Sequence, residues 1–372
     1  MALSAGLNPQ ALLKRALNTK FRNPFSRRTG YLVLDIGSSS IKLAEVVHES
    51  GGPRLTSLAT APVPPTAIQS NVIQEELPVL EAIKALLDTT RAQATEVITA
   101  VPGPAVIVKK VVLPAHSGTA IDAAVLGEAS HLIPDSLDNV NLDYQVIDTI
   151  EDGNKMEVLV VAVKRDIINS YTSVIRAAGL DPALVDVDYF ALENMYELNY
   201  ELAGDAPVAL VNIGARYSSI NILKNGRSTF TGDVPVGGAE FNDALVRQLG
   251  ISNDDADLVK RGRSVSGIDQ ASVEPILGSV TEFISEEIQR AISFFWTAAT
   301  DEPIGAVVLS GGPARMPGLA THLQERLQTQ VEVADPFRRV RIDGRIDRGL
   351  IEESGPALAV AVGLATRRPG DK

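Results

Sequence analysis

The strongest constraint on the fold of this chain is a pattern that occurs twice. Residues 31–46 read YLVLDIGSSSIKLAEV and residues 208–223 read VALVNIGARYSSINIL. In each copy a polar residue stands near the end of an apolar run, an Ile-Gly pair and a short polar turn follow, and a second apolar run begins, which predicts a β-hairpin. A third strand is expected after each hairpin, near residues 55–61 and 228–233. Two such meanders indicate an internal duplication, and therefore a two-domain α/β protein whose two turns face each other.

The first turn has the composition of a phosphate-binding loop. It consists of a glycine and three serines, Gly37, Ser38, Ser39 and Ser40. Backbone N–H groups and hydroxyls of such small residues can converge on an anion. Lys42 adds a positive charge, and Asp35 is placed to hold a hydrated Mg²⁺, which takes few protein ligands. The turn returns to a strand, so it is neither a Walker A loop nor a dinucleotide fingerprint. Taken alone, the motif is equally consistent with an ordinary hairpin turn.

The composition excludes several kinds of site. The 372 residues include no cysteine, so disulfides and thiolate metal sites are ruled out. The four histidines have no metal-binding spacing, and the net charge of −12 argues against nucleic acid as a partner. No apolar run approaches the roughly 18 to 20 residues that span a bilayer.

The first 30 residues differ from the rest, because they contain six basic residues and no acidic one. We predict a basic extension outside the two domains. Contact with an anionic membrane surface and a flexible solubilising tail are both open interpretations, and a transit peptide has a similar composition. The stretch has no continuous apolar segment, so a secretory signal is not expected.

Residues 106–187 have an internal order of their own, strand-helix-strand-strand-helix-strand. The predicted strands are at 106–113, 141–148, 156–163 and 183–187, and the helices are at 119–131 and 165–178. No residue in this segment suggests chemistry. We interpret it as an interaction subdomain.

The second half of the chain contains several short motifs. Gly237-Gly238 precede a helix at 239–249, whose N-terminus could approach an anion. In the next predicted helix, at 252–261, Asp257 and Lys260 share a face. Residues 306–310 form a buried strand that ends in Gly311-Gly312, shortly before a helix that begins near Pro317.

Two further helices are predicted. The stretch 271–300 has an apolar stripe that we interpret as core packing, formed by Val280, Phe283, Ile284, Ile288, Ile292 and Phe295. Residues 355–365 form a helix of small residues that could close back on the first half.

This ordered set of motifs resembles the superfamily of actin, the DnaK chaperones and the sugar kinases. Within it, the chain looks most like the PilM family of type IV pilus assembly proteins, which are relatives of the cell-division protein FtsA. The segments that carry the resemblance are DIGSSSIK at 35–42, AVP at 100–102, GG at 237–238, VVLSGG at 307–312, MPGL at 316–319, VEVADPF at 331–337 and AVGLA at 361–365.

The resemblance implies an α/β protein with the actin-like (ribonuclease H-like) duplicated two-domain fold and an FtsA-type inserted subdomain. The first domain would span 31–105 and be completed by 188–203 and 352–366. The inserted subdomain would span 106–187. The second domain would span 204–351, with 234–302 as its helical subdomain.

The resemblance also implies that ATP or ADP binds with Mg²⁺ between the two domains. The implied ligands in the first phosphate loop are Asp35, which also holds the metal, Gly37, Ser38, Ser39, Ser40 and Lys42. Those in the second phosphate loop are Asn212, Gly214, Ala215 and Arg216, with Gly237 and Gly238 nearby. Asp257 and Lys260 match a Glu-x-x-Lys pair that holds the nucleoside, and Gly311, Gly312 and Met316 match the adenosine loop.

One residue departs from the family pattern. The second phosphate loop usually carries an aspartate where this chain has Asn212. An amide cannot act as a carboxylate base or as a charged partner of the metal. We therefore assign no catalytic residue and expect at most a slow ATPase. A tolerated substitution in a site that was never fast is the alternative.

The implied role is that of a cytoplasmic platform protein, peripheral to the inner membrane. It would bind the N-terminal cytoplasmic tail of a PilN-like inner-membrane partner in a groove involving the inserted subdomain, among other components of a pilus or secretion platform. A self-associating, FtsA-like filament protein is the main alternative. A small-molecule kinase is disfavoured, because the sequence shows neither a catalytic acid nor a larger substrate domain.

Overall fold

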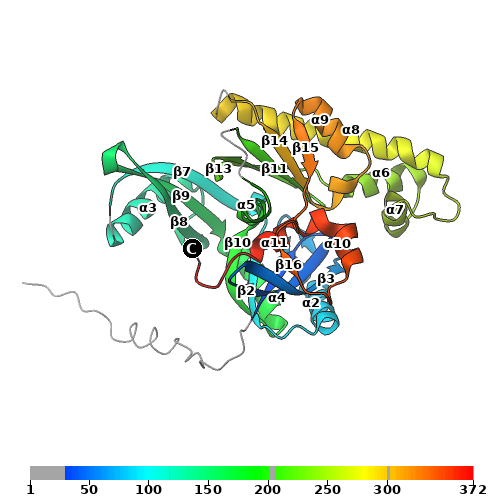
Figure 1. Cartoon of the computed structure of the whole chain (residues 1–372), viewed down its shortest axis with the longest axis horizontal. Helices are drawn as coiled ribbons and strands as arrows, with labels where there is room; N and C mark the ends of the chain where they lie inside the picture. The colour runs from blue at the N-terminus through cyan, green and yellow to red at the C-terminus, as the bar shows by residue number, and fades with distance from the viewer. Residues whose placement is uncertain (1–29, 117, 202–205, 300–301, 372) are drawn as a thin grey trace, which may run out of the picture.

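The computed structural model describes residues 30–116, 118–201, 206–299 and 302–371. It contains a six-stranded sheet, a five-stranded sheet and a separate three-stranded sheet (Figure 1). The predicted basic extension lies outside the described residues except for Gly30. No helix of the described ranges has both the length and the apolar character needed to cross a membrane.

The six-stranded sheet is built on the first hairpin. Its strands follow the order β10-β6-β1-β2-β3-β16. Successive side chains of a strand point to opposite faces, so β1 is buried on both sides. Leu32 and Leu34 face α2 and α4, while Val33 faces α5 and α11. The bounds of the strands are β1 Tyr31–Ile36, β2 Ser40–Glu49, β3 Gly52–Pro62, β6 Glu96–Val101, β10 Asp181–Val187 and β16 Arg341–Ile342. The bounds of the helices are α2 Glu76–Thr90, α4 Arg165–Ala177, α5 Asp188–Asn199 and α11 Ala359–Leu364.

The five-stranded sheet repeats the same arrangement around the second hairpin. Its order is β13-β12-β11-β14-β15. In both sheets the first hairpin strand pairs antiparallel with the second and parallel with a later strand, β6 in one sheet and β14 in the other. The predicted duplication is therefore confirmed. The strands are β11 Val208–Ile213, β12 Ser218–Lys224, β13 Arg227–Val234, β14 Ala306–Ser310 and β15 Gln330–Val333.

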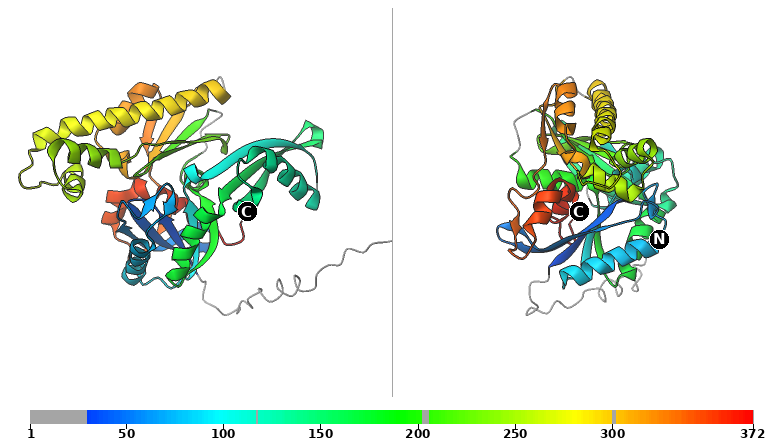
Figure 2. Two further views of the ribbon diagram at one scale, coloured as in Figure 1. Left: turned by 180° about the vertical axis from the view of Figure 1, so that it is seen from behind. Right: turned by 90° about the vertical axis from the view of Figure 1, so that its right-hand side faces the viewer.

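Helices cover one face of the five-stranded sheet. They are α6 Ala239–Leu249, α7 Asn253–Lys260, α8 Gln270–Ala299 and α9 Leu319–Leu327. The predicted stripe of α8 is buried at Val280, Ile284, Ile288 and Ile292. Phe283 is 43% exposed and does not belong to the core, and the side chain of Phe295 lies outside the described residues. Seen from behind, α8 lies across this sheet (Figure 2).

The inserted sheet contains fewer residues than the predicted segment 106–187. Its strands are β7 Val106–Pro114, β8 Val140–Ile150 and β9 Lys155–Lys164, and α3 Thr119–Leu132 packs on one face. The helix and strand that follow it belong elsewhere. α4 packs against α2, and β10 pairs parallel with β6. Pairing with β6 extends the main sheet, so only residues 106–164 form the inserted sheet.

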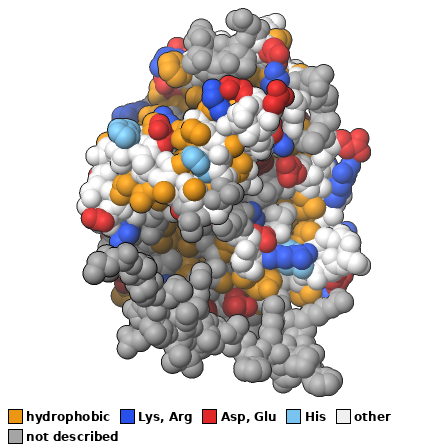
Figure 3. All heavy atoms as spheres, turned by 90° about the vertical axis from the view of Figure 1, so that its left-hand side faces the viewer, with side chains coloured by type: hydrophobic (Ala, Val, Ile, Leu, Met, Phe, Trp, Pro, Cys, Tyr) orange, Lys and Arg blue, Asp and Glu red, His pale blue; other side chains and the backbone are white. Residues whose placement is uncertain are grey.

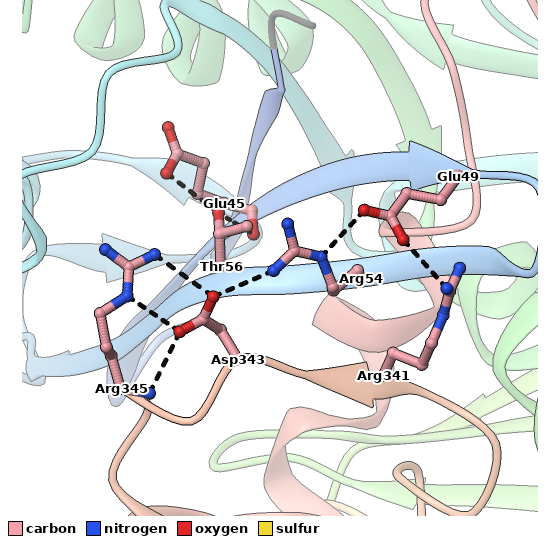
Figure 4. Close-up of polar contacts among 7 residues, drawn as sticks. All are labelled: Glu45, Glu49, Arg54, Thr56, Arg341, Asp343 and Arg345. Atoms are coloured by element: carbon pink, nitrogen blue, oxygen red, sulfur yellow. Dashed lines mark hydrogen bonds and ion pairs between the residues drawn. The ribbon is translucent and has the colours of Figure 1, made fainter.

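The chain also returns to the six-stranded sheet within the segment 204–351, which we predicted as the second domain. β16 pairs parallel with β3. Arg54 of β3 contacts Glu49 at 3.1 Å and Asp343 at 3.0 Å, while Arg341 contacts Glu49 at 2.9 Å (Figure 4). This ion-pair network fixes the returning segment to the edge of the first sheet. The last elements, α10 Arg348–Ser354 and η5 Gly355–Leu358, lead into α11.

Two helices connect the halves of the molecule. α5 contacts strands of both main sheets and packs closely against α11. A Cβ atom added to Gly363 would lie 1.7 Å from the carbonyl oxygen of Ala191, so only glycine permits this approach. In Figure 1, α5 lies at the centre of the molecule, between the inserted sheet and the five-stranded sheet.

Candidate functional site

The first turn joins β1 to β2 and places its charged residues side by side. Asp35 and Lys42 are opposite each other in the strand register. The Lys42 Nζ lies 3.1 Å from Asp35 Oδ2, and each side chain is 15% exposed. The turn is closed by a hydrogen bond from Gly37 N to Ser40 O of 3.1 Å. Ser38 and Ser40 are half-buried and Ser39 is exposed, so the turn is open to a ligand.

The second turn has the same construction with different chemistry. Gly214 N donates to Tyr217 O at 3.0 Å, and Asn212 lies opposite Ser219 in the register where Asp35 lies opposite Lys42. Ser310 Oγ, at the end of β14, donates to Asn212 Oδ1 at 3.2 Å. The amide oxygen of Asn212 is therefore held by the neighbouring strand.

The predicted glycine pairs both pack against this second turn. Gly238 N donates to Gly214 O at 2.8 Å, and Ala239 N donates to Ala215 O at 2.8 Å. A Cβ atom on Gly237 would lie 2.6 Å from Ala215 O. Small residues at these positions let the backbone before α6 lie directly against the second turn.

Gly311 brings the third segment to the same place. It adopts a φ of 92°, and a Cβ atom there would lie 2.0 Å from Ile213 O. Its N–H donates to Pro356 O in η5 at 2.9 Å. The loop after β14 thus contacts both the second hairpin and the closing segment of the chain. Gly312 is exposed, while Met316 packs against the core of the second domain.

The Asp257–Lys260 pair forms as the spacing predicted. Lys260 Nζ lies 3.1 Å from Asp257 Oδ1 and also donates to Asn242 Oδ1. Burial lowers the pKa of Lys260 from its ordinary value. Asn242 lies in the first turn of α6, whose N-terminal residues contact the second turn. The structure therefore places the pair near the second turn. The sequence did not indicate that Asn242 contacts this pair.

Two contacts join the second turn to the first domain. Arg216, which is exposed, donates from Nη2 to Pro65 O, in the loop after β3. Tyr217 OH donates to Asp188 Oδ2 at 2.9 Å. Burial and then the charges of nearby carboxylates, including Asp188 and Asp35, raise the pKa of Tyr217 well above its ordinary value. These contacts hold the second turn against the first domain.

Sequence reasoning missed a hydrogen-bonded group of acids and tyrosines at the start of α5, in which Asp188 and Tyr189 are buried. Asp188 is 5% exposed, and burial raises its pKa to about 7, against the effect of its hydrogen bond from Tyr217. Its neighbour Tyr189 is 2% exposed and donates to Asp233 Oδ2. Burial raises the pKa of Asp233 to about 6. One signal was present, because Asp188 follows an apolar strand just as Asp35 ends one.

The donor set decides which ligands the site suits. The first turn supplies small residues, Lys42 and a single carboxylate, Asp35, which fits an anion accompanied by a metal that keeps its water ligands. Within the described ranges no group of three or more His, Cys, Asp or Glu could hold a metal ion.

Comparison with known proteins decides the family. The sequence pattern described as type IV pilus assembly protein PilM matches residues 33–369. The chain belongs to the PilM family. A solved structure of a PilM-PilN type IV pilus biogenesis complex has a TM-score of 0.78 and 27% identity, covering 91% of this chain and 98% of the other.

More distant matches concern the fold. The ethanolamine utilization protein EutJ of Carboxydothermus hydrogenoformans has a TM-score of 0.56 and 15% identity, with 96% of each chain covered. Together with the PilM match, it confirms the predicted actin-like α/β fold. The cell division protein FtsA of Bacillus subtilis (strain 168) is 29% identical over 155 residues, and this match covers 35% of this chain and 34% of that protein.

Proposed function

We propose that this PilM-family chain is a cytoplasmic, nucleotide-binding scaffold of a type IV pilus or related assembly platform. ATP or ADP with Mg²⁺ would bind between the two turns. The N-terminal cytoplasmic peptide of a PilN-like inner-membrane protein would bind at the inserted sheet. This places the protein at the inner membrane as a peripheral component.

The observation that carries the nucleotide assignment is the convergence of backbone segments around the second turn. Gly237, Gly238 and Gly311 each allow an approach that a side chain would prevent. In this proposal the first turn, with Lys42 and Asp35, would face them across the nucleotide. An ordinary pair of hairpin turns has no need for three glycine-dependent contacts at one of them.

The residues of the site have distinct roles in this proposal. Backbone N–H groups of the two turns and Lys42 would bind the phosphates, and Asp35 would hold water ligands of the metal. When bound, the nucleotide supplies the anionic phosphates that bring Mg²⁺ into the site. Asp35 already neutralises Lys42 at 3.1 Å, so the lysine is positioned before a ligand arrives.

The same residues argue for slow hydrolysis. Asn212 is neutral, and its amide oxygen accepts a hydrogen bond from Ser310. The nearby carboxylate of Asp188 accepts a hydrogen bond from Tyr217. Asn212 offers no charged base to an attacking water, and Asp188 is buried away from solvent. Nucleotide binding would therefore serve to stabilise one conformation of the protein.

The partner assignment is supported by the surface of the inserted sheet. Val112, Leu126 and Val146 are 51%, 52% and 40% exposed. Figure 3 faces this end of the molecule and shows hydrophobic side chains in several groups on it. The related solved structure is a complex of PilM with PilN.

Calorimetric titration of the full chain with Mg²⁺-ATP tests the nucleotide site. We expect binding, and we expect Lys42→Met to weaken it by about tenfold or more, because a charge-assisted hydrogen bond to phosphate is lost. Lys84→Met, on the exposed face of α2, is the matched control and leaves the affinity unchanged. Absence of heat at millimolar nucleotide would contradict the proposal.

Fluorescence anisotropy with a labelled peptide tests the partner site. The probe is the N-terminal cytoplasmic segment of a PilN-like protein from the same genome. Val112→Asp should weaken its binding, whereas Leu77→Asp on α2, where Leu77 is 64% exposed, should not. Equal effects of the two substitutions would show that the inserted sheet is not part of the peptide-binding interface.

A further inference from the structure

Helix α5 begins with two adjacent residues, each hydrogen-bonded to the second domain. Tyr217 OH donates to Asp188 Oδ2 at 2.9 Å, and Tyr189 OH donates to Asp233 Oδ2. The pairs are crossed, because α5 supplies the acceptor of one bond and the donor of the other. We call these four residues, Asp188, Tyr189, Tyr217 and Asp233, the Tyr–Asp latch.

One end of the latch belongs to the second turn. The carbonyl of Tyr217 accepts the hydrogen bond from Gly214 that closes this turn. A Cβ atom on Gly214 would lie 2.9 Å from that carbonyl oxygen, so the turn is tight. A ligand that moves the backbone of the turn therefore moves Tyr217, and with it the partner of Asp188.

The other end of the latch touches the start of the inserted sheet. A Cβ atom on Gly103 would lie 2.2 Å from the ring of Tyr189, so the ring lies directly against this glycine. Gly103 begins η1 (Gly103–Ala105), and β7 of the inserted sheet follows immediately. The same short helix lies against β13, which carries Asp233. Tyr189 is thus held between the inserted sheet and the second domain.

Burial makes these contacts cooperative. Asp188 and Tyr189 are 5% and 2% exposed. The backbone of Tyr189 is held as well, because Asn221 Nδ2 donates to its carbonyl oxygen at 3.0 Å. Breaking either Tyr–Asp bond would leave a buried polar group without its partner, which is costly in a low-dielectric interior. Asp188, Tyr189 and Tyr217 are therefore expected to move together, with the exposed Asp233 linked to them through Tyr189.

We propose that the Tyr–Asp latch couples the second turn to the inserted sheet, so that nucleotide in the cleft changes the conformation that the inserted sheet offers to a protein partner. This inference rests on the proposed nucleotide site. Its physical basis is a continuous set of contacts from Gly214 through Tyr217, Asp188 and Tyr189 to Gly103. Nucleotide can change the conformation of the inserted sheet only if it binds more tightly to one arrangement of the latch than to the other.

Hydrogen–deuterium exchange of the full chain, with and without Mg²⁺-AMPPNP, tests the coupling. In the wild-type chain, nucleotide should change exchange in η1 and β7 as well as at the second turn. Tyr189→Phe removes only the hydroxyl, so it should abolish the response of β7 while nucleotide affinity stays within about threefold by calorimetry. Asp233→Ala removes the acceptor and tests the same bond from its other side. Tyr196→Phe is the matched control, because it makes the same change on the same helix outside the latch.

The outcomes separate the two proposals. If calorimetry detects no nucleotide binding by the wild-type chain, the proposed nucleotide site is wrong, and so is the proposed coupling through the latch. If nucleotide binds but β7 of the wild type does not respond, or responds in both Tyr189→Phe and Asp233→Ala as it does in the wild type, the latch is wrong and the nucleotide site stands. Loss of the β7 response in both variants, with Tyr196→Phe like the wild type, supports the latch.

Discussion

At the scale of single residues, the two turns have the same backbone and different charges. Asp35 and Asn212 occupy equivalent places at the ends of β1 and β11. The first keeps a carboxylate beside Lys42, whereas the second has an amide held by Ser310. A duplicated scaffold thus has a carboxylate near the end of the first hairpin strand in one domain and an amide in the other. The turn that follows the amide is the one that contacts the other loops of the second domain.

The substitution Asn212→Asp tests what this difference does. It restores a carboxylate of nearly the same size, which can still accept the hydrogen bond from Ser310. We expect the wild-type chain to release phosphate barely above background, and we expect the variant to be faster by about tenfold or more, since a positioned base contributes about 10²-fold to 10⁴-fold. Steady-state phosphate release with Mg²⁺-ATP measures both.

Two results would contradict this interpretation of Asn212. Brisk turnover by the wild-type chain would show that the amide does not disable the site. An unchanged rate in Asn212→Asp, with nucleotide binding intact, would show that another feature limits hydrolysis, such as the hydrogen bond that Asp188 accepts from Tyr217.

At the scale of elements, the hairpins were predictable and several of their neighbours were not. Strand, turn and returning strand leave a local signal, because apolar runs and Gly-rich turns lie next to each other in the sequence. The pairings of β10 with β6 and of β16 with β3 join segments far apart in the chain. No local periodicity encodes such a partner, so the predicted inserted segment was too long and the returning strand was missed.

The residues of the candidate site also divide into those with a local sequence signal and those without one. The turn residues and the glycine pairs were found from composition and spacing. Asp188, Tyr217 and Asn242 were not, because their significance comes from contacts with residues on other elements. Exposed positions within helices were also hard to predict, as Phe283 of α8 shows.

The glycine after β14 gives a prediction at this scale. Gly311→Ala places a Cβ atom 2.0 Å from Ile213 O at a φ of 92°, so β14 and β11 must move apart at the site. We expect a loss of about 1 to 3 kcal/mol in the free energy of unfolding, together with weaker nucleotide binding. Thermal unfolding and calorimetry measure the two effects.

The adjacent glycine is the matched control for this change. A Cβ atom on Gly312 would meet nothing within 4 Å. Gly312→Ala should therefore leave the unfolding temperature nearly unchanged. Equal behaviour of the two variants would mean that close packing after β14 does not hold the second turn in place.

At the scale of the whole molecule, the two domains meet around α5 and α11, and several acidic residues with raised pKa values lie there, of which Asp188 is buried. Asp188 and Asp233 take part in the Tyr–Asp latch, and burial raises the pKa of Glu193, also on α5, to about 7. An interface with only a structural role would be at least as stable if apolar residues replaced these acids. Buried carboxylates that accept specific hydrogen bonds instead define one relative placement of the domains, and they make that placement sensitive to protons.

The pH dependence of unfolding tests this sensitivity at Asp188. The groups that face it are Tyr171, Tyr217, Asp233 and the backbone of Gly103 and Tyr189. Because its folded pKa of about 7 lies above the ordinary 3.8, the folded protein keeps a proton that the unfolded chain releases. Stability from this group is therefore present at about pH 4 and is lost as the pH rises towards 7. Asp188→Asn has no proton to lose, so relative to wild type it should gain about 2 to 4 kcal/mol between pH 4 and pH 8. Urea unfolding at the two pH values measures the difference, with the exposed Asp138→Asn as control. A constant difference between variant and wild type would show that Asp188 does not link the domain interface to pH.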